Sequence, residues 1–267
     1  MTDLSTADRR FATTLARGLS VLRAFRPADD GLGNAEIAER TGLPKSTVSR
    51  LTYTLHSLGY LTHARHGERY RPGPALLALG NVAAASIGFV ELAGPIMQRL
   101  ADETRTLTLL GVRDRGRLLL TKVWRPAGVS SIWLDVGHRV PIRGSSSGAC
   151  YLAAVPEDVL PRVADEAQGD RGLTIDTATA IRAGAYDQLF ARGFVITDPA
   201  EYFAANIHAV STPFHPRDLT EPVVFTCGAL PEDLTVARME TEVGPALRAS
   251  VRELETALGH APGPARR

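Results

Sequence analysis

The stretch Asn34-Ala-Glu-Ile-Ala-Glu-Arg-Thr-Gly-Leu-Pro-Lys-Ser-Thr-Val-Ser-Arg-Leu51 decides the fold of the first part of this 267-residue chain. A helix-turn-helix needs a small residue where its two helices touch, a glycine in the turn four residues later, and a β-branched apolar residue six positions further on. Ala38, Gly42 and Val48 meet these three requirements. The spacing therefore predicts two helices, 35–40 and 45–58, joined by a tight turn.

The residues on either side extend the pattern to a third helix and a hairpin. From Thr14 to Phe25, apolar residues recur at spacings of three and four, which predicts an amphipathic helix. Asn34 is a residue type that caps helices, so we expect it to precede the helix 35–40. Residues 60–71 are typical of two short strands around a bend at 66–68. Three helices followed by a hairpin predict a winged helix-turn-helix.

The second helix of the motif carries the side chains that we expect to contact DNA. They combine cations for phosphates with hydroxyl and guanidinium groups for base edges. The predicted contacts are Lys45, Ser46, Thr47, Ser49 and Arg50. The alternative is a three-helix packing unit whose polar face merely meets water. We favour DNA because the run 45–50 lacks the acidic residues that a solvated helix face normally mixes in.

The hairpin adds a second, less specific group of cations. Arg65, Arg69 and Arg71 lie beside His63 and His66, which would suit phosphate or minor-groove contacts. Hairpin tips are also often basic for no functional reason, so both interpretations stay open.

The net charge of +1 conceals two unlike parts. Residues 1–75 hold 11 basic and 7 acidic residues, a net charge of +4. The remaining 192 residues hold 19 basic and 22 acidic residues, a net charge of −3. A basic head on an acidic body is compatible with nucleic-acid binding by the head alone.

The rest of the chain alternates helix and strand patterns. The expected helices are 75–85, 90–103, 148–154, 181–193 and 232–258, and the expected strands are 107–112, 118–124, 131–135, 194–197, 207–213 and 223–227. The economical architecture is an antiparallel sheet with helices packed on it, an α+β fold. We expect a DNA-binding domain at 1–73, linker helices at 74–104, a second domain at 105–260 and a flexible tail at 261–267.

The two cysteines argue against a disulfide framework or a zinc site. Cys150 and Cys227 are far apart and show no metal-ligand spacing. We expect no metal and no cofactor. The N-terminus lacks the pattern of a secretory signal, and no apolar run reaches the roughly 18 residues of a membrane span. The sequence therefore predicts a cytoplasmic protein without a membrane partner.

The chain resembles the IclR family of bacterial transcriptional regulators. The resemblance lies in Ala16-Arg-Gly-Leu-Ser-Val-Leu22, residues 36–51, Leu58-Gly-Tyr-Leu61 and Tyr70-Arg-Pro-Gly-Pro-Ala-Leu-Leu-Ala-Leu-Gly80, and continues weakly to about Gly259. It implies a winged-helix head, a linker helix and a GAF-like effector-binding domain. It also implies a homodimer, or a dimer of dimers, on palindromic double-stranded operator DNA. Arg17, within the first stretch, joins the expected DNA contacts.

Three further segments resemble the effector-pocket motifs of the family. The first is the loop before the helix 148–154, where free backbone donors at a helix N-terminus suit a carboxylate. The implied effector residues are Gly144, Ser145 and Ser146 in that loop, Asp198, Glu201 and Ala209 in the second segment, and Phe225 and Cys227 in the third. Phe225 and Cys227 stand where serines are common in the family. With Trp133, Tyr202 and Phe203, they favour a more apolar cavity and an aromatic or larger organic acid.

Other interpretations of the second domain remain open. Trp133 suits a core position as well as a pocket wall. The run Gly144-Ser-Ser-Ser-Gly148 with His208 and Asp198 supplies a hydrolase-like set of residue types. However, the preceding residues Arg-Val-Pro-Ile-Arg are not the buried strand that a nucleophile elbow needs. Cys227 would be the reactive residue of a redox sensor, although buried strand cysteines usually act as small apolar residues. We expect no enzyme activity.

Overall fold

The computed structural model describes residues 10–64, 68–85, 87–128, 132–167 and 171–259. Contacts within the chain divide it into two compact units, residues 1–86 and 87–267. The expected linker, 74–104, corresponds to two helices that fall in different units.

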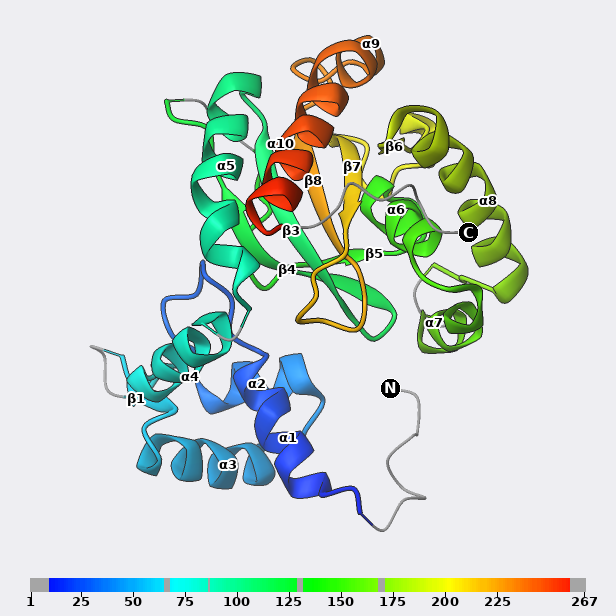
Figure 1. The fold of residues 1–267 in the computed structure, drawn as a ribbon. Helices are drawn as coiled ribbons and strands as arrows, with labels where there is room; N and C mark the ends of the chain where they lie inside the picture. The colour runs from blue at the N-terminus through cyan, green and yellow to red at the C-terminus, as the bar shows by residue number, and fades with distance from the viewer. Residues whose placement is uncertain (1–9, 65–67, 86, 129–131, 168–170, 260–267) are drawn as a thin grey trace. The chain divides into compact units, whose positions relative to one another are not determined.

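Unit 1 is a winged helix-turn-helix (Figure 1). Its elements are α1 (Thr13–Leu22), α2 (Asn34–Thr41), α3 (Lys45–Ser57), β1 (Leu61–His63), β2 (Tyr70–Pro72) and α4 (Pro74–Ala85). β1 and β2 pair antiparallel as the two strands of the wing. The expected bend at 66–68 lies partly outside the described residues.

The core of unit 1 holds the two helices of the motif at a fixed angle. Val21, Ile37, Val48 and Leu61 are almost fully buried and pack together, so each element contributes one apolar anchor. Gly42 ends α2 with φ +69°, a left-handed conformation that glycine adopts without steric cost. The motif residues thus lie where their spacing in the sequence predicts them, at the contact between the two helices and in the turn.

The cap of α2 differs from the expected one. Asn34 is the first residue of the helix, and Gly33 precedes it as the cap. The Gly33 amide donates to the Glu36 carboxylate over 2.8 Å. Asn34 instead accepts a hydrogen bond of 2.9 Å from Thr52 through Oδ1, which ties α2 to α3. The side chain serves packing between the helices because Glu36 already satisfies the first amide.

Unit 2 is built on a six-stranded antiparallel sheet with the strand order β5-β4-β3-β8-β7-β6. Its strands are β3 (Leu107–Asp114), β4 (Arg117–Trp124), β5 (Arg139–Pro141), β6 (Val195–Ile196), β7 (His208–Phe214) and β8 (Val223–Ala229). Its helices are α5 (Phe89–Thr104), α6 (Ser146–Ala154), η1 (Glu157–Val159), α7 (Leu160–Ala167), α8 (Ile175–Arg192), η2 (Pro199–Glu201), α9 (Val236–Arg238), η3 (Met239–Val243) and α10 (Gly244–Ala257).

Helices cover both faces of this sheet (Figure 1). α5 and α10 lie side by side on one face, over a core that includes Phe214 and Phe225. α6, α7 and α8 pack on the other face, around Tyr151 and Val224. The two cores meet the sheet from opposite sides because successive strand residues point to opposite faces.

Two expected elements of unit 2 differ from the observed ones. Residues 132–135 form no strand, and the strand that borders β4 is β5, which begins at Arg139. The expected helix 232–258 is broken into α9, the π-helical turn η3 and α10. Met239 and Val243 are buried in that turn, so the apolar period is kept although the helix geometry changes.

No single helix among the described residues is long and apolar enough to cross a membrane. α4 and α5 satisfy that test of length and hydropathy only when they are counted as a pair.

Candidate functional site

The candidate DNA-binding face lies at the N-terminal half of α3. Lys45, Ser46, Ser49 and Arg50 are exposed there, whereas Thr47 is half-buried. Val48 and Thr52 point inward and fix the rotation of the helix, so the polar residues face outward together. α3 has no acidic residue at all. The face therefore presents two cations and several hydroxyl groups to an anionic partner.

The two cations of this face, Lys45 and Arg50, have no carboxylate partner within the part of the chain that the structure describes. No hydrogen bond or ion pair to the side chain of Lys45 or Arg50 occurs among residues 10–64 and 68–85. Arg17 on α1 is exposed in the same way. Cations without carboxylate partners are available for phosphate oxygens.

The arginines of the wing are engaged within unit 1. Arg69 donates from Nη2 to the Gly31 carbonyl over 2.8 Å and to the Glu36 carboxylate over 2.9 Å. Arg71 forms an ion pair with Asp30. These contacts tie the wing to the loop before α2. Arg65 lies outside the described residues.

The wing also contains an aromatic stack that the sequence pattern did not reveal. The His56 and His63 rings lie 4.4 Å apart between centroids, and His63 lies 4.9 Å from the Tyr70 ring. The stack joins the C-terminal end of α3 to both strands of the wing. It therefore helps to fix the wing relative to α3.

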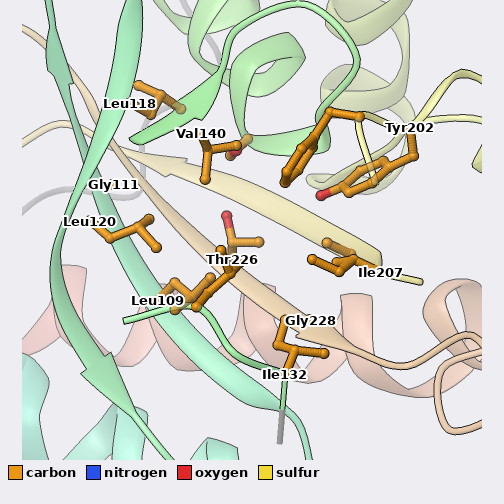
Figure 2. Close-up of a pocket in the computed structure, with 14 residues that line it drawn as sticks. Leu109, Gly111, Leu118, Leu120, Ile132, Val140, Tyr202, Ile207, Thr226 and Gly228 are labelled. Atoms are coloured by element: carbon orange, nitrogen blue, oxygen red, sulfur yellow. The ribbon is translucent and has the colours of Figure 1, made fainter. Parts of the chain in front are cut away.

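Unit 2 contains an inner cavity on the sheet face that carries α6 (Figure 2). Its volume is about 10 Å³, room for one water molecule. It is lined by Leu109, Gly111, Leu118, Leu120, Ile132, Leu134, Val140, Ser147, Tyr202, Phe203, Ile207, Ala209, Thr226 and Gly228. None of these side chains carries a charge. The chemistry of the lining is thus that of an apolar site, although the space in it is small.

A chain of hydroxyl groups runs from the wall of the inner cavity into the sheet. The Tyr202 hydroxyl lies beside Ser146 at the beginning of this chain. Ser146 Oγ lies 2.9 Å from Ser211 Oγ, which lies 2.8 Å from Thr226 Oγ1. Burial raises the pKa of Tyr202 to about 12, so its hydroxyl stays protonated at neutral pH. These groups provide hydrogen-bond partners without any formal charge.

Most of the expected loop residues line a second, open hollow beside the inner cavity, which we call the outer cleft. Its volume is about 770 Å³. Gly144, Ser145, Asp198 and Glu201 lie in its wall, together with Arg143, Arg171 and the α8 residues Ala180, Ile181 and Gly184. Of the expected effector residues, only Ala209 lines the inner cavity. Ser146 is fully buried behind its wall.

Besides Ser146, three expected effector residues line neither hollow. Phe225 and Cys227 face α5 and α10, on the opposite side of the sheet. Their neighbours Thr226 and Gly228 face the inner cavity, because a shift of one residue along a strand exchanges the two faces. Trp133 is 57% exposed, and its ring packs edge-on against His138. It belongs neither to the core nor to the inner cavity, because its neighbours Ile132 and Leu134 are the residues of this segment that point inward.

The geometry favours neither hydrolysis nor thiol chemistry. Ser146 Oγ lies 2.9 Å from Ser211 Oγ, whereas the His208 ring is 2.8 Å from the Leu234 carbonyl. The serine and the histidine therefore do not form a nucleophile and base pair. Burial raises the pKa of the Cys227 thiol to about 11, which disfavours the reactive thiolate.

Comparison with known proteins gives the same division of the chain. The model of the IclR helix-turn-helix domain matches residues 14–65, and that of the bacterial transcriptional regulator IclR C-terminal region matches residues 82–183. The HTH-type transcriptional regulator TsaQ1/TsaQ2 of Comamonas testosteroni is 27% identical over 247 residues, which are 92% of this chain and 88% of that protein.

Solved structures share the architecture. An IclR family transcriptional regulator from Brucella abortus is 31% identical, covers 97% of both chains and has a TM-score of 0.72. An IclR homolog from Microbacterium hydrocarbonoxydans, solved in complex with 4-hydroxybenzoate, has the same fold with 20% identity and a TM-score of 0.67, over 90% of this chain and 99% of that one. The winged helix-turn-helix, the α+β second unit and these matches together show that the chain belongs to the IclR family of transcriptional regulators.

Proposed function

We propose that unit 1 binds double-stranded operator DNA through the N-terminal half of α3 and that a small ligand in unit 2 changes this binding. The observation that carries the proposal is the face of α3, where exposed Lys45 and Arg50 have no carboxylate partner among the described residues. Arg50 would read base edges in the major groove, and Lys45 would hold a phosphate.

The inner cavity supports a small aromatic or otherwise apolar ligand. Its lining is apolar, and the hydroxyl groups at its wall supply a few polar contacts. The homolog solved with 4-hydroxybenzoate makes monocyclic aromatic acids the first compounds to test. The expected loop residues Gly144, Ser145, Asp198 and Glu201 would meet the ligand on the side of the outer cleft. Regulation requires that this ligand prefer one arrangement of the protein and that DNA prefer another.

Exposed apolar helices support a homodimer, or a dimer of dimers, on a palindromic operator. α4 has no buried residue, and Leu77, Leu79 and Val82 are each more than half exposed. α1 exposes Leu15 and Leu19. A second copy that covers such faces would place two copies of α3 on successive half-sites, so the symmetry of the operator follows that of the protein.

Binding to the DNA upstream of the chain's own gene tests the DNA-binding part of the proposal. At one fixed salt concentration, Arg50→Ala should weaken binding to the footprinted site by about 1–3 kcal/mol. Arg252→Ala, which removes an exposed arginine of α10, is the matched control and should leave binding unchanged. Equal affinities of the Arg50→Ala variant and the unmodified chain would contradict the assignment of α3.

A further inference from the structure

The inner cavity and the outer cleft share one residue in their walls, Tyr202. The remaining residues that line one hollow do not line the other. Figure 2 shows the Tyr202 side chain at the edge of the inner cavity, with its hydroxyl turned toward the interior. The phenol ring is therefore the partition between a closed apolar space and one that is open to solvent.

The Tyr202 hydroxyl lies beside the beginning of α6. The polar groups of Ser146, the first residue of that helix, oppose the rise that burial causes in the pKa of Tyr202. The first amides of a helix have no partner within the helix, so they are strong donors. The tyrosine hydroxyl lies beside this polar end of the helix.

The segment that carries Tyr202 makes few backbone hydrogen bonds to the rest of unit 2. It begins with η2, a single turn capped by the Asp198 side chain, and Glu201 is exposed. The Phe203 amide donates to the Gly144 carbonyl over 2.7 Å and anchors the segment to the loop before α6. Most other backbone groups of η2 bond within the turn itself. Such a turn can move as a unit around its anchor.

The size of the inner cavity determines which side chain must move before a ring can enter. The inner cavity has room for one water molecule and for no ring. The departure of the Tyr202 ring would add a space of the size and shape of a phenol. The outer cleft, with Arg143 and Arg171 in its wall, supplies the positive charges that the inner cavity lacks.

We propose that the outer cleft is the entrance to the inner cavity and that Tyr202 is the gate between them, a placeholder whose ring leaves when a monocyclic aromatic ligand enters. The proposal rests on the function proposed for the inner cavity. In the closed state the tyrosine hydroxyl sits where the polar group of the ligand would sit, at the N-terminus of α6.

A thiol placed inside the inner cavity reports on the gate. Ala209 is buried and lines the cavity, so Ala209→Cys puts a reporter there at the cost of one sulfur atom. The reagent is iodoacetamide, and mass spectrometry of peptides locates each label. The native Cys150 and Cys227 are fully buried and serve as internal controls for global unfolding.

The gate and the entrance are tested by different changes. Adding Tyr202→Ala should speed labelling at position 209 by about tenfold or more, because the partition is gone. Adding Gly184→Trp instead should slow labelling severalfold, because Gly184 lines the outer cleft and faces open space. Gly94→Trp, at an equally open position on α5 across the sheet, is the matched control and should change nothing.

Phenol tests the role of the ring as a placeholder. In the double variant with Tyr202→Ala, millimolar phenol should fill the vacated space and return labelling toward the rate seen with the tyrosine, as small aromatic molecules fill engineered apolar cavities. Cyclohexanol, which is not planar, should protect less.

Each result decides one part of the proposal. Unchanged labelling with Tyr202→Ala, or no protection by phenol, would overturn the gate, and unchanged labelling with Gly184→Trp would overturn the entrance. If Cys150 and Cys227 also became reactive with Tyr202→Ala, Tyr202→Leu would decide. That variant keeps an apolar side chain but loses the ring, so it should still label faster at position 209 alone, while an unchanged rate would refute the gate. None of these measurements involves DNA, so they stand apart from the test with Arg50→Ala.

Discussion

Arg113 donates two hydrogen bonds of 2.7 Å to the carboxylate of Glu221, one from Nε and one from Nη2. The Tyr151 hydroxyl donates to the same carboxylate over 2.8 Å, and Arg162 donates over 2.5 Å. β3, α6, α7 and the loop before β8 therefore meet at one acidic side chain. The Arg113 guanidinium lowers the pKa of Glu221 to about 2.

Glu221→Gln should destabilise unit 2 by on the order of 3 kcal/mol at neutral pH, because it removes the negative charge that Arg113 and Arg162 share and leaves the partly buried Arg113 with Glu166 alone. The contribution of this carboxylate is complete above its ordinary pKa of 4.5 and is lost as the pH falls toward 2. Urea unfolding at pH 7 and at pH 3 measures this. The difference between the two proteins should shrink at pH 3, and a constant difference would contradict the assignment.

Ser211→Ala should cost about 1–3 kcal/mol, because it removes the middle of the hydroxyl chain and leaves Ser146 and Thr226 without a shared partner. Combining it with Thr226→Val should cost less than the sum of the two single changes, since the second change removes an unsatisfied group. Denaturant titrations of the four proteins form the double-mutant cycle. Simple additivity would show that the chain is not coupled.

Gly144→Ala and Gly184→Ala should have opposite effects on stability. Gly144 has φ +80°, and an added Cβ would lie 2.8 Å from the Glu201 carbonyl, so we expect a loss of about 1–3 kcal/mol. Gly184 lies within α8 with open space around it, so alanine should stabilise by about 0.5–1 kcal/mol. Thermal unfolding compares the pair. A stabilised Gly144→Ala variant would mean that the loop is not held as described.

Arg69→Ala should lower the stability of unit 1 as well as DNA affinity. Arg69 ties the wing to Gly31 and Glu36, whereas Arg50 has no such contacts among the described residues. Arg50→Ala should thus weaken DNA binding with no change in melting temperature, while Arg69→Ala should lower both. Melting curves and binding isotherms separate the two roles. An Arg69→Ala variant that melts normally would point to a purely electrostatic role in binding DNA.

Leu79→Glu should weaken self-association of the full chain, because it places a charge on the apolar face of α4. Phe190 on α8 is still more exposed, at 79%, and Phe190→Glu is the control for a general effect of added charge. Analytical ultracentrifugation over a range of concentrations gives the dissociation constants. If only Phe190→Glu dissociated the protein, the interface would lie on unit 2.

The motif spacing predicted unit 1 well because its information is local. Ala38, Gly42 and Val48 act within one turn and two helices, so their roles follow from positions along the chain. Which residues of β8 face the inner cavity depends on the register of that strand. The resemblance placed Phe225 and Cys227 toward the ligand, and the pleat turns Thr226 and Gly228 there instead.

Tyr202 and Phe203, which the sequence analysis expects beside an apolar cavity, line the inner cavity, but the hydroxyl chain could not be predicted from the sequence. Tyr202, Ser146, Ser211 and Thr226 come from a loop, a helix and two strands, and only the folded sheet brings their oxygens together. No local pattern marks such a set. The expectation for Trp133 was wrong for a different reason: a large aromatic residue suggests burial, but its neighbours Ile132 and Leu134 take the buried positions and leave Trp133 exposed.

The hydroxyl chain has no built-in polarity. Between Ser146 and Ser211, and between Ser211 and Thr226, either oxygen can supply the hydrogen. Reversal of one bond allows the others to reverse with it, so the row can offer an acceptor or a donor at its end at similar cost. A guest with a hydroxyl and one with a carbonyl would then be received alike, and their selection would depend on shape rather than on the sense of their hydrogen bonds.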